Sequence, residues 1–242
     1  MNLIVDIGNT WVKYAVFQEG NLLMQQKMDA KQFAAQLATV FKTYPQIEKA
    51  IIAATGTVEE QTVEVLEQFC SVHRLSSHSK TPFTNLYKTP LTLGVDRIAL
   101  AAAAFYHNPK GNTLVVDLGT CVTYDIVNDK GEYLGGGIAP GLYMRYQAMH
   151  QQTAGLPLLQ PEFPDTLIGT NTASSMHTGT FLGLCHELDG TIDQYRARFQ
   201  HLTVILTGGD SHFFVERLKN HIFADAIFLL KGLDYLLEYN LK

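Results

Sequence analysis

A short polar turn near the start of the chain has residue types that can bind phosphate groups and a cation. An apolar strand ends there in the run Asp6-Ile7-Gly8-Asn9-Thr10. A carboxylate at the end of a buried strand, such as Asp6, needs a partner or a metal ion, because burying a lone charge is costly. Gly8 permits a tight turn and a close backbone approach, and the N–H groups and short side chains of Asn9 and Thr10 suit phosphate oxygens. Lys13, on the strand expected next, adds a positive charge within reach.

The same pattern occurs a second time, near the middle of the chain. Residues 3–23 and 114–134 align without a gap, so that Asp117 takes the place of Asp6 and is followed by a glycine and Thr120. Each segment predicts a meander of three strands, separated by a D-x-G turn and a second glycine turn. A single D-x-G turn is equally well explained as turn chemistry, and two unrelated hairpins are the alternative to a duplication. Two copies, with a Thr-Gly-Gly-Asp turn late in the chain, favour two similar halves that meet at a ligand-binding cleft.

A second group of candidate residues lies just before a helix. The apolar helix predicted at 98–106 is preceded by the run Gly94-Val95-Asp96-Arg97. Asp96 at a helix start is favoured by the helix dipole, so capping is its simplest explanation. Tyr87 and Arg97 lie nearby in the sequence, and this combination suits an anionic ligand that carries hydroxyl groups. Thr172 likewise opens a helix rich in small residues, where capping is favoured over substrate binding.

Other common site motifs are missing from the sequence. It contains no GxxxxGK[ST] run, and the three glycines at 135–137 lack the spacing of a dinucleotide fingerprint. The nine histidines form no HExxH motif, and no G-x-S-x-G nucleophile turn is present. The three cysteines are an odd number without CxxC spacing, which argues against a disulfide framework and against a zinc site. If a nucleotide binds, the sequence predicts that it is held neither by a GxxxxGK[ST] loop nor by a dinucleotide-binding glycine motif.

Composition narrows the class of protein further. The 242 residues are 46% hydrophobic and 17% charged, which is globular composition, and the formal net charge is −5. A negative net charge provides no electrostatic footprint for nucleic acid or for an anionic membrane. The longest apolar stretch, at 98–106, is about half of what a bilayer span needs. The first residues lack the basic segment of a signal peptide, and we expect a cytoplasmic protein that handles small molecules.

The elements that must position these residues predict an α/β protein with mixed sheets that helices cover on both faces. The run Asn-Pro-Lys-Gly-Asn at 108–112 separates an apolar helix from a strand, and it predicts a boundary between domains 1–110 and 111–242. Outside the two meanders we expect helices at 30–44, 58–69, 142–153, 171–199 and 213–220, strands or strand-turn units at 51–56, 71–75, 203–210 and 226–228, and a C-terminal helix.

Taken together, the motifs resemble those of the type III pantothenate kinases, a family of the acetate and sugar kinase/Hsp70/actin superfamily. The D-x-G turns mark only the superfamily, whereas G-x-D-R seven residues after Tyr87 and the later G-G-x-I-x-P-G run are far more specific. The motifs follow the order of the family and span nearly the whole chain. They are Asp6–Thr10 with Lys13, Tyr87, Gly94–Arg97, Asp117–Thr120, Gly135–Gly141, Thr153–Pro157, Asn171-Thr172 and Thr207–Asp210.

The resemblance implies a fold and a reaction. The fold would be two tandem ribonuclease H-like (actin-like ATPase) domains, each a mixed sheet flanked by helices, with a cleft between the domains. The reaction would be ATP-dependent phosphorylation of the primary hydroxyl of pantothenate, the first step of coenzyme A synthesis. The family also implies a homodimer whose partner chain completes the pantothenate pocket, which makes 137–157 a candidate interface. No nucleic-acid or membrane partner is implied.

The resemblance also implies roles for individual residues. It implies Mg²⁺ close to Asp6, a monovalent cation (potassium or ammonium) on Asp117, and Asp96 as the general base. The implied ATP-binding residues are Asp6, Ile7, Gly8, Asn9, Thr10, Trp11, Val12, Lys13 and Thr120. The implied substrate contacts are Tyr87, Gly94, Val95, Asp96, Arg97 and Thr172.

One departure from the family pattern and two alternatives remain open at this point. The residues before Gly94, Pro90-Leu91-Thr92-Leu93, lack the acidic residue that relatives often carry there. The alternatives are a kinase for another small hydroxylated acid or sugar, and a nucleotide-binding regulatory protein of the same fold that has lost turnover. The presence of Asp6, Asp96, Arg97 and Asp117 argues against a pure regulator, because a protein that only binds a nucleotide has no need of a general base.

Overall fold

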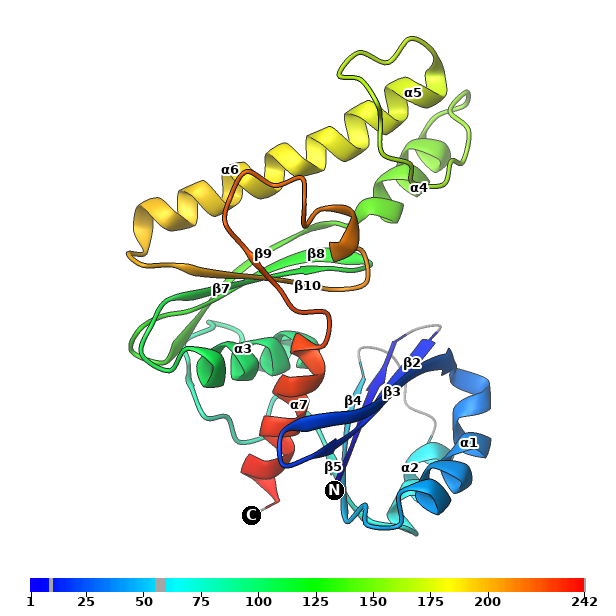
Figure 1. Cartoon of the computed structure of the whole chain (residues 1–242), viewed down its shortest axis with the longest axis vertical. Helices are drawn as coiled ribbons and strands as arrows, with labels where there is room; N and C mark the ends of the chain where they lie inside the picture. Colours follow the sequence, from blue (N-terminus) through cyan, green and yellow to red (C-terminus); the bar gives the residue numbers. More distant parts are fainter. Residues whose placement is uncertain (9–10, 55–59, 242) are drawn as a thin grey trace. The chain divides into compact units, whose positions relative to one another are not determined.

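The computed structural model describes residues 1–8, 11–54 and 60–241 of the chain (Figure 1). The chain divides into two compact units, one made of 1–107 with 228–242 and the other of 108–227. Among the described residues, no helix is both long enough and apolar enough to cross a membrane. Each unit has its own sheet, and each is described by itself below.

The sheet of the first unit has five strands in the order β3-β2-β1-β4-β5. β1 pairs antiparallel with β2 and parallel with β4, so the sheet is mixed, as expected. The strands are β1 (Asn2–Ile7), β2 (Trp11–Gln18), β3 (Asn21–Asp29), β4 (Lys49–Ala54) and β5 (Ser71–Arg74), with a short β6 (Thr84–Asn85) later in this unit. The helices are α1 (Ala30–Thr43), α2 (Glu60–Glu67), α3 (Val95–His107) and α7 (Phe228–Asn240).

Helices cover both faces of this first sheet. On one face, the alternate residues Leu3, Val5 and Ile7 of β1 pack with Phe33 and Leu37 of α1 in a buried cluster. On the other face, α7 packs against β1 and β4, and α3 packs against α7 (Figure 1). β1 is therefore buried on both sides, which explains its almost uninterrupted apolar sequence.

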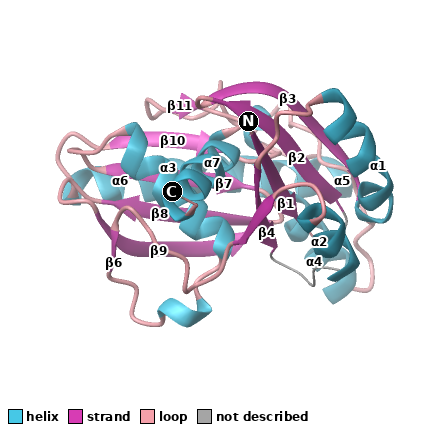
Figure 2. Ribbon diagram, turned by 90° about the horizontal axis from the view of Figure 1, so that it is seen from below, coloured by secondary structure: helices cyan, strands magenta, loops and turns pink. Residues whose placement is uncertain are grey.

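In the sheet of the second unit, the strands that belong to this unit follow the order β11-β10-β7-β8-β9, and they lie side by side in Figure 2. β7 pairs antiparallel with β8 and parallel with β10. The strands are β7 (Thr113–Leu118), β8 (Cys121–Val127), β9 (Glu132–Pro140), β10 (Thr203–Thr207) and β11 (Phe223–Ala224). The helices are α4 (Leu142–Gln152), α5 (Thr172–His177) and α6 (Gly183–Arg198), and a π-helical turn at Thr178–Leu182 joins α5 to α6.

Both predicted meanders are confirmed, with β1-β2-β3 in one unit and β7-β8-β9 in the other. The helix expected at 213–220 is wrong: only a 3₁₀ turn at 211–213 and further turns occupy the segment. The N–H groups of Lys219 and Asn220 donate to the Asp189 carboxylate, at 3.0 and 3.1 Å, rather than to helical carbonyls. The strand expected at 226–228 is also wrong, because β11 pairs with β10 at 223–224 and Phe228 already begins α7.

The division into units differs in one respect from the expected domains 1–110 and 111–242. The first break falls at 107/108, close to the expected position, but the C-terminal helix α7 returns to the first unit. Its buried residues pack on α3 and on β1 and β4. The packing of α7 in the first unit depends on contacts between residues far apart in the chain, and no local sequence pattern predicts it.

A polar contact inside the first unit ties α7 to β1. The Asn2 side-chain amide donates to Asp234 at 2.7 Å and to Glu238 at 2.9 Å, and both acceptors lie on α7. Asp234 is buried, and burial raises the pKa of its carboxyl, while the hydrogen bond from Asn2 opposes that rise. The amide therefore compensates a carboxylate that has left water.

We expect Asn2→Ala to lower the free energy of unfolding by about 2–3 kcal/mol, because it leaves a buried carboxylate without its donor. Urea unfolding followed by circular dichroism measures this loss. Asn21→Ala is the matched control, because Asn21 is exposed and makes one long 3.4 Å bond in a turn; its effect should stay within about 0.5 kcal/mol. Equal midpoints for the two variants would contradict the role given to Asn2.

Candidate active site

Asp6 lies near the carboxyl end of β1, where the two neighbouring strands bring further groups to it. Lys13 of β2 and Ala53 of β4 are its register partners. Burial raises the pKa of the Asp6 carboxyl to about 6, the positive charge of Lys13 lowers it, and the negative charge of Asp96 raises it. Asp6 and Asp96 are thus electrostatic neighbours within one unit, although 90 residues separate them in the sequence. A carboxylate held in this way favours a nearby cation.

A backbone hydrogen bond joins the two described ends of the turn after Asp6. The Gly8 N–H donates to the Trp11 carbonyl at 3.0 Å, and β2 begins at Trp11. Ile7 and Val12 are buried in the apolar core, so only their backbone groups remain for a ligand. The Trp11 ring is 48% exposed. Asn9 and Thr10, two of the expected phosphate contacts, lie outside the described residues.

The corresponding turn of the second unit is one residue shorter. Asp117 pairs with Thr123 across β7 and β8, whereas Asp6 pairs with Lys13 across β1 and β2. The gap-free sequence alignment therefore shifts by one residue on the second strand, and Thr123 takes the structural place of Lys13. Because threonine carries no charge, only the first unit carries a positive charge at this position.

Asp117 lies at the end of β7 beside a glycine that the fold requires. Gly208, just after β10, has φ +96°, and a Cβ on it would lie 2.3 Å from Asp117 Oδ1 and 2.3 Å from the Leu118 carbonyl oxygen. The two oxygens thus converge on one small space that a side chain would fill. Thr120, in the turn between β7 and β8, is exposed.

Asp96 stands in the first turn of α3, with one carboxylate oxygen accepting the Arg97 N–H at 2.8 Å. This bond satisfies one N–H group at the helix start, which is the capping role that the sequence favours, and the negative charge of Asp96 also raises the pKa of Asp6. Gly94 makes room for it, because a Cβ at Gly94 would lie 2.4 Å from Asp96 Oδ1. Val95 is half-buried and begins the helix.

Arg97 and Tyr87 form a contact in the same unit. The Arg97 guanidinium carbon lies 5.6 Å from the centre of the Tyr87 ring, within range of a cation–π interaction. Arg97 is only 5% exposed, and the Tyr87 N–H donates to the Asn85 side chain at 3.0 Å. The structure therefore brings together the pair that the sequence marked as a site for an anion with hydroxyl groups.

Thr172 is the first residue of α5, and the structure corrects the capping role that the sequence favoured for it. The cap is Asn171, whose side chain accepts the Ser174 N–H at 2.9 Å, while the Ser174 hydroxyl accepts the Asn171 N–H at 3.1 Å. The Thr172 side chain is exposed and is not used by this cap.

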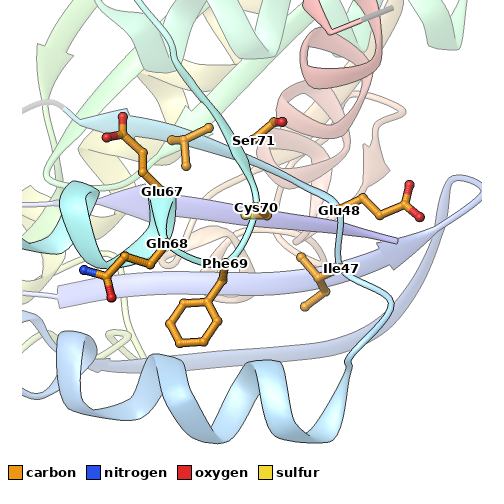
Figure 3. Close-up of a pocket in the computed structure, with 8 residues that line it drawn as sticks. Ile47, Glu48, Glu67, Gln68, Phe69, Cys70 and Ser71 are labelled. Atoms are coloured by element: carbon orange, nitrogen blue, oxygen red, sulfur yellow. The ribbon is translucent and has the colours of Figure 1, made fainter.

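A cavity of about 640 Å³ in the first unit is lined by neither Asp6 nor Lys13 (Figure 3). It opens at the start of β4 and β5, whereas Asp6 lies near the end of β1, which runs parallel to β4. Burial raises the pKa of the Cys70 thiol in this cavity to about 11, which leaves it a weak nucleophile near neutral pH. The lining residues are Ile47, Glu48, Glu67, Gln68, Phe69, Cys70, Ser71 and Val72.

Metal binding by protein side chains alone has no support in the described part of the chain. There, no group of three His, Cys, Asp or Glu side chains is placed to hold a metal ion. A carboxylate such as Asp6 is nevertheless a fitting ligand for Mg²⁺, which usually binds through one or two carboxylates and substrate phosphates and keeps several waters.

Comparisons with solved structures support the fold. A Baf family transcriptional activator from Campylobacter jejuni superposes with a TM-score of 0.63 at 22% identity, and 98% of each chain is covered. A ROK family glucokinase from Streptomyces griseus superposes with a TM-score of 0.53 at 13% identity, covering 99% of this chain and 98% of the other. At these identities the likeness concerns the fold, an actin-like ATPase architecture, and nothing more.

Sequence comparisons are more specific. The model of the family described as type III pantothenate kinase matches residues 2–194. A type III pantothenate kinase from Flavobacterium johnsoniae is 42% identical over 241 residues, covering 100% of this chain and 99% of the relative. One from Christiangramia forsetii is 44% identical over 240 residues, covering 99% of each. The chain therefore belongs to the type III pantothenate kinase family.

Proposed function

We propose that this protein transfers the γ-phosphoryl group of ATP to the primary hydroxyl of pantothenate, the first step of coenzyme A synthesis. Membership of the family supports the reaction. The structural observation that supports it most is the placement of two carboxylates beside cationic side chains, Asp6 opposite Lys13 and Asp96 next to the buried Arg97. Asp6 precedes a phosphate-binding type of turn, and Asp96 lies in the first turn of a helix beside Arg97.

The proposed division of labour follows from the chemistry of phosphoryl transfer. Its transition state is loose, so the protein contributes mainly positioning and charge stabilisation. The N–H groups of the turn after Asp6 and the ammonium group of Lys13 hold phosphate oxygens. Thr120, in the equivalent turn of the second unit, is the proposed further ATP contact. Trp11 contributes an exposed ring beside the phosphate turn.

Asp96 is the proposed general base, which takes the proton of the pantothenate hydroxyl as the phosphoryl group is transferred. The guanidinium group of Arg97 binds the carboxylate of pantothenate or orients its polar atoms, and the Tyr87 ring supports that guanidinium. Gly94 and Val95 contribute backbone at the helix start. Thr172, exposed on α5, is the proposed substrate contact that comes from the second unit.

Two cations belong to this proposal. Mg²⁺ would be held by the phosphates close to Asp6, and when bound it neutralises charge on the transferred group. A monovalent cation, potassium or ammonium, would bind at Asp117. The Asp117 carboxylate supplies an oxygen donor of the kind that suits a hard cation.

We also propose a cytoplasmic homodimer, with neither nucleic acid nor a membrane as a partner. The dimer is supported by large apolar side chains that are exposed between residues 138 and 168 of the second unit. Exposed apolar surface of this kind is typical of an interface. The residues, with their exposed fractions, are Ile138 (65%), Tyr143 (45%), Leu158 (54%), Leu167 (71%) and Ile168 (74%).

The test of the proposed function is mass spectrometry of the products. The purified protein is incubated with ATP, Mg²⁺ and K⁺ in the presence of pantothenate, of other hydroxylated acids, or of sugars. Phosphorylated pantothenate, formed faster than any other product, is the expected result. Preference for another acceptor would indicate a kinase of different specificity, and ATP binding without any product would indicate a regulatory protein without turnover.

The proposed cation site makes a prediction for Gly208. Gly208→Ala should displace the Asp117 carboxylate, since the new Cβ would lie 2.3 Å from it. We expect the K⁺ concentration at half-maximal activity to rise by roughly 10–100-fold, the usual cost of disturbing the support of a metal ligand. Gly209→Ala is the control, because a Cβ there meets nothing within 4 Å. An unchanged K⁺ dependence in Gly208→Ala would exclude Asp117 as the ligand.

A further inference from the structure

A second lysine lies beside Lys13 in the first sheet, on a strand that no motif marks. In the antiparallel pairs, Asp6 faces Lys13 and Lys13 faces Lys27 of β3. Register partners place their side chains on the same face of a sheet, with Cβ atoms about 5 Å apart. Three neighbouring strands therefore carry one row of charged side chains, a carboxylate followed by two ammonium groups, at the edge where the phosphate turn begins.

The Trp11 ring holds the second ammonium group of this row, that of Lys27, in a defined position. Lys27 Nζ lies 4.8 Å from the centre of the Trp11 ring. Trp11 is two residues before Lys13 on the same strand, so its ring stands on the face that carries the row. The ring is 48% exposed and the Lys27 side chain is exposed. The ammonium group is thus held beside the phosphate turn while remaining accessible to a ligand.

The balance of charge explains what this lysine could bind. Lys13 stands between Asp6, whose pKa it lowers, and Lys27. Two like charges on directly opposed residues repel each other unless opposite charge lies near them. Asp29, the register partner of Trp11, supplies one negative charge on the same face. A polyphosphate supplies several negative charges. One divalent cation and one lysine together do not neutralise all of them, so a second lysine can still bind favourably.

We propose that Lys27 is a second phosphate-binding lysine, which the Trp11 ring holds in position for the polyphosphate of the nucleotide. The proposal deepens the proposed function and rests on ATP being the phosphoryl donor. Lys27 is a binding residue in this account, so its loss weakens binding of the nucleotide and leaves binding of pantothenate unchanged. Only the pairing of β2 with β3 reveals it, since 14 residues separate Lys27 from Lys13 along the chain.

The chain contains a single tryptophan, and it is Trp11, so fluorescence reports directly on this contact. Titrations use ATP, inorganic tripolyphosphate and adenosine as separate probes, with Mg²⁺ present. We expect ATP and tripolyphosphate to change the Trp11 emission and adenosine to leave it unchanged, because the phosphates draw the Lys27 ammonium from the ring. An emission that does not respond to either phosphate probe, while calorimetry detects their binding, would overturn the proposal.

Lys27→Met, which keeps an unbranched stem but removes the charge, is the decisive variant. We expect the Kd and the KM for ATP to rise about tenfold, with the KM for pantothenate unchanged. Lys27→Arg should recover most of the affinity. Lys42→Met is the matched control, because Lys42 is exposed on α1 and its loss changes the net charge equally. Wild-type affinity for ATP in Lys27→Met would overturn the proposal.

The outcomes separate this proposal from the proposed function. If the parent protein binds ATP but does not phosphorylate pantothenate, the proposed function fails, and the affinities of Lys27→Met still decide the role of Lys27. If pantothenate is phosphorylated and Lys27→Met equals Lys42→Met in ATP affinity, the role of Lys27 fails alone. Thermal unfolding of each variant verifies that it is folded. Lys27→Gln serves as a second neutral variant, and it must lose as much affinity for ATP as Lys27→Met.

Discussion

Asp96→Asn is expected to lower kcat for pantothenate phosphorylation by about 10²–10⁴-fold, the usual contribution of a general base. The variant keeps the size and shape of the side chain, and its amide oxygen can still accept the Arg97 N–H that Asp96 accepts at 2.8 Å. The start of α3 should therefore stay in place. What the amide cannot do is take a proton from the acceptor hydroxyl, so the loss should appear in kcat rather than in the affinity for ATP.

Steady-state kinetics with both substrates, together with calorimetric titration of ATP, measures these two quantities separately. Asp129→Asn is the matched control, since Asp129 is exposed in the turn between β8 and β9 and should keep the parent kcat. Turnover of Asp96→Asn close to that of the parent, with ATP binding intact, would refute the assignment of Asp96 as the base. An equal loss in kcat and in ATP affinity would point instead to a role in placing Asp6.

Gly232→Ala is expected to destabilise the first unit by about 3 kcal/mol, at the upper end of the usual cost of overpacking. A Cβ at this position of α7 would lie 1.9 Å from the Ala99 carbonyl oxygen and 2.7 Å from its carbon. Both are backbone atoms of α3, so no side chain can rotate away. The helices must separate, and α3 carries Asp96 at its start, so kcat should fall as well.

Thermal unfolding should detect the change as a fall in Tm of roughly 6–12 °C for a chain of this size. For Gly190→Ala, the same type of substitution, we expect the opposite effect on stability. Gly190 lies inside α6, and a Cβ there meets nothing within 4 Å, so alanine should stabilise the helix by about 0.5–1 kcal/mol. A Gly232→Ala protein as stable as the parent would show that α3 and α7 do not pack as closely as described.

Much of the fold could be predicted because its signals are local. An apolar strand, a D-x-G turn and a second strand identified both meanders, and the helices at α1, α3 and α4 were placed to within a few residues. The failures arose where a distant group overrides local preference. Residues 213–220 have a helical composition, but the Asp189 carboxylate binds the N–H groups of Lys219 and Asn220, so the helix does not form.

For the candidate site too, local sequence predicted the residue types but not the interactions between distant residues. Residue types alone marked Asp6, Lys13 and Asp96 as groups for a cation, a phosphate and a proton. The sequence did not indicate that the charge of Asp96 raises the pKa of Asp6, because this interaction depends on how α3 packs against α7 and β4. Likewise the cap of α5 fell to Asn171 rather than Thr172, a difference of one residue that depends on backbone geometry.

The sequence by itself determined the family, the order of the elements and the chemistry of the main side chains, since motifs and periodicity are properties of neighbouring residues. Only the tertiary structure decided that the C-terminal helix joins the first unit and that Lys27 stands beside Lys13. Strand register and helix packing depend on contacts between segments far apart in the chain. Their energies come from burial and pairing that no local window of sequence contains.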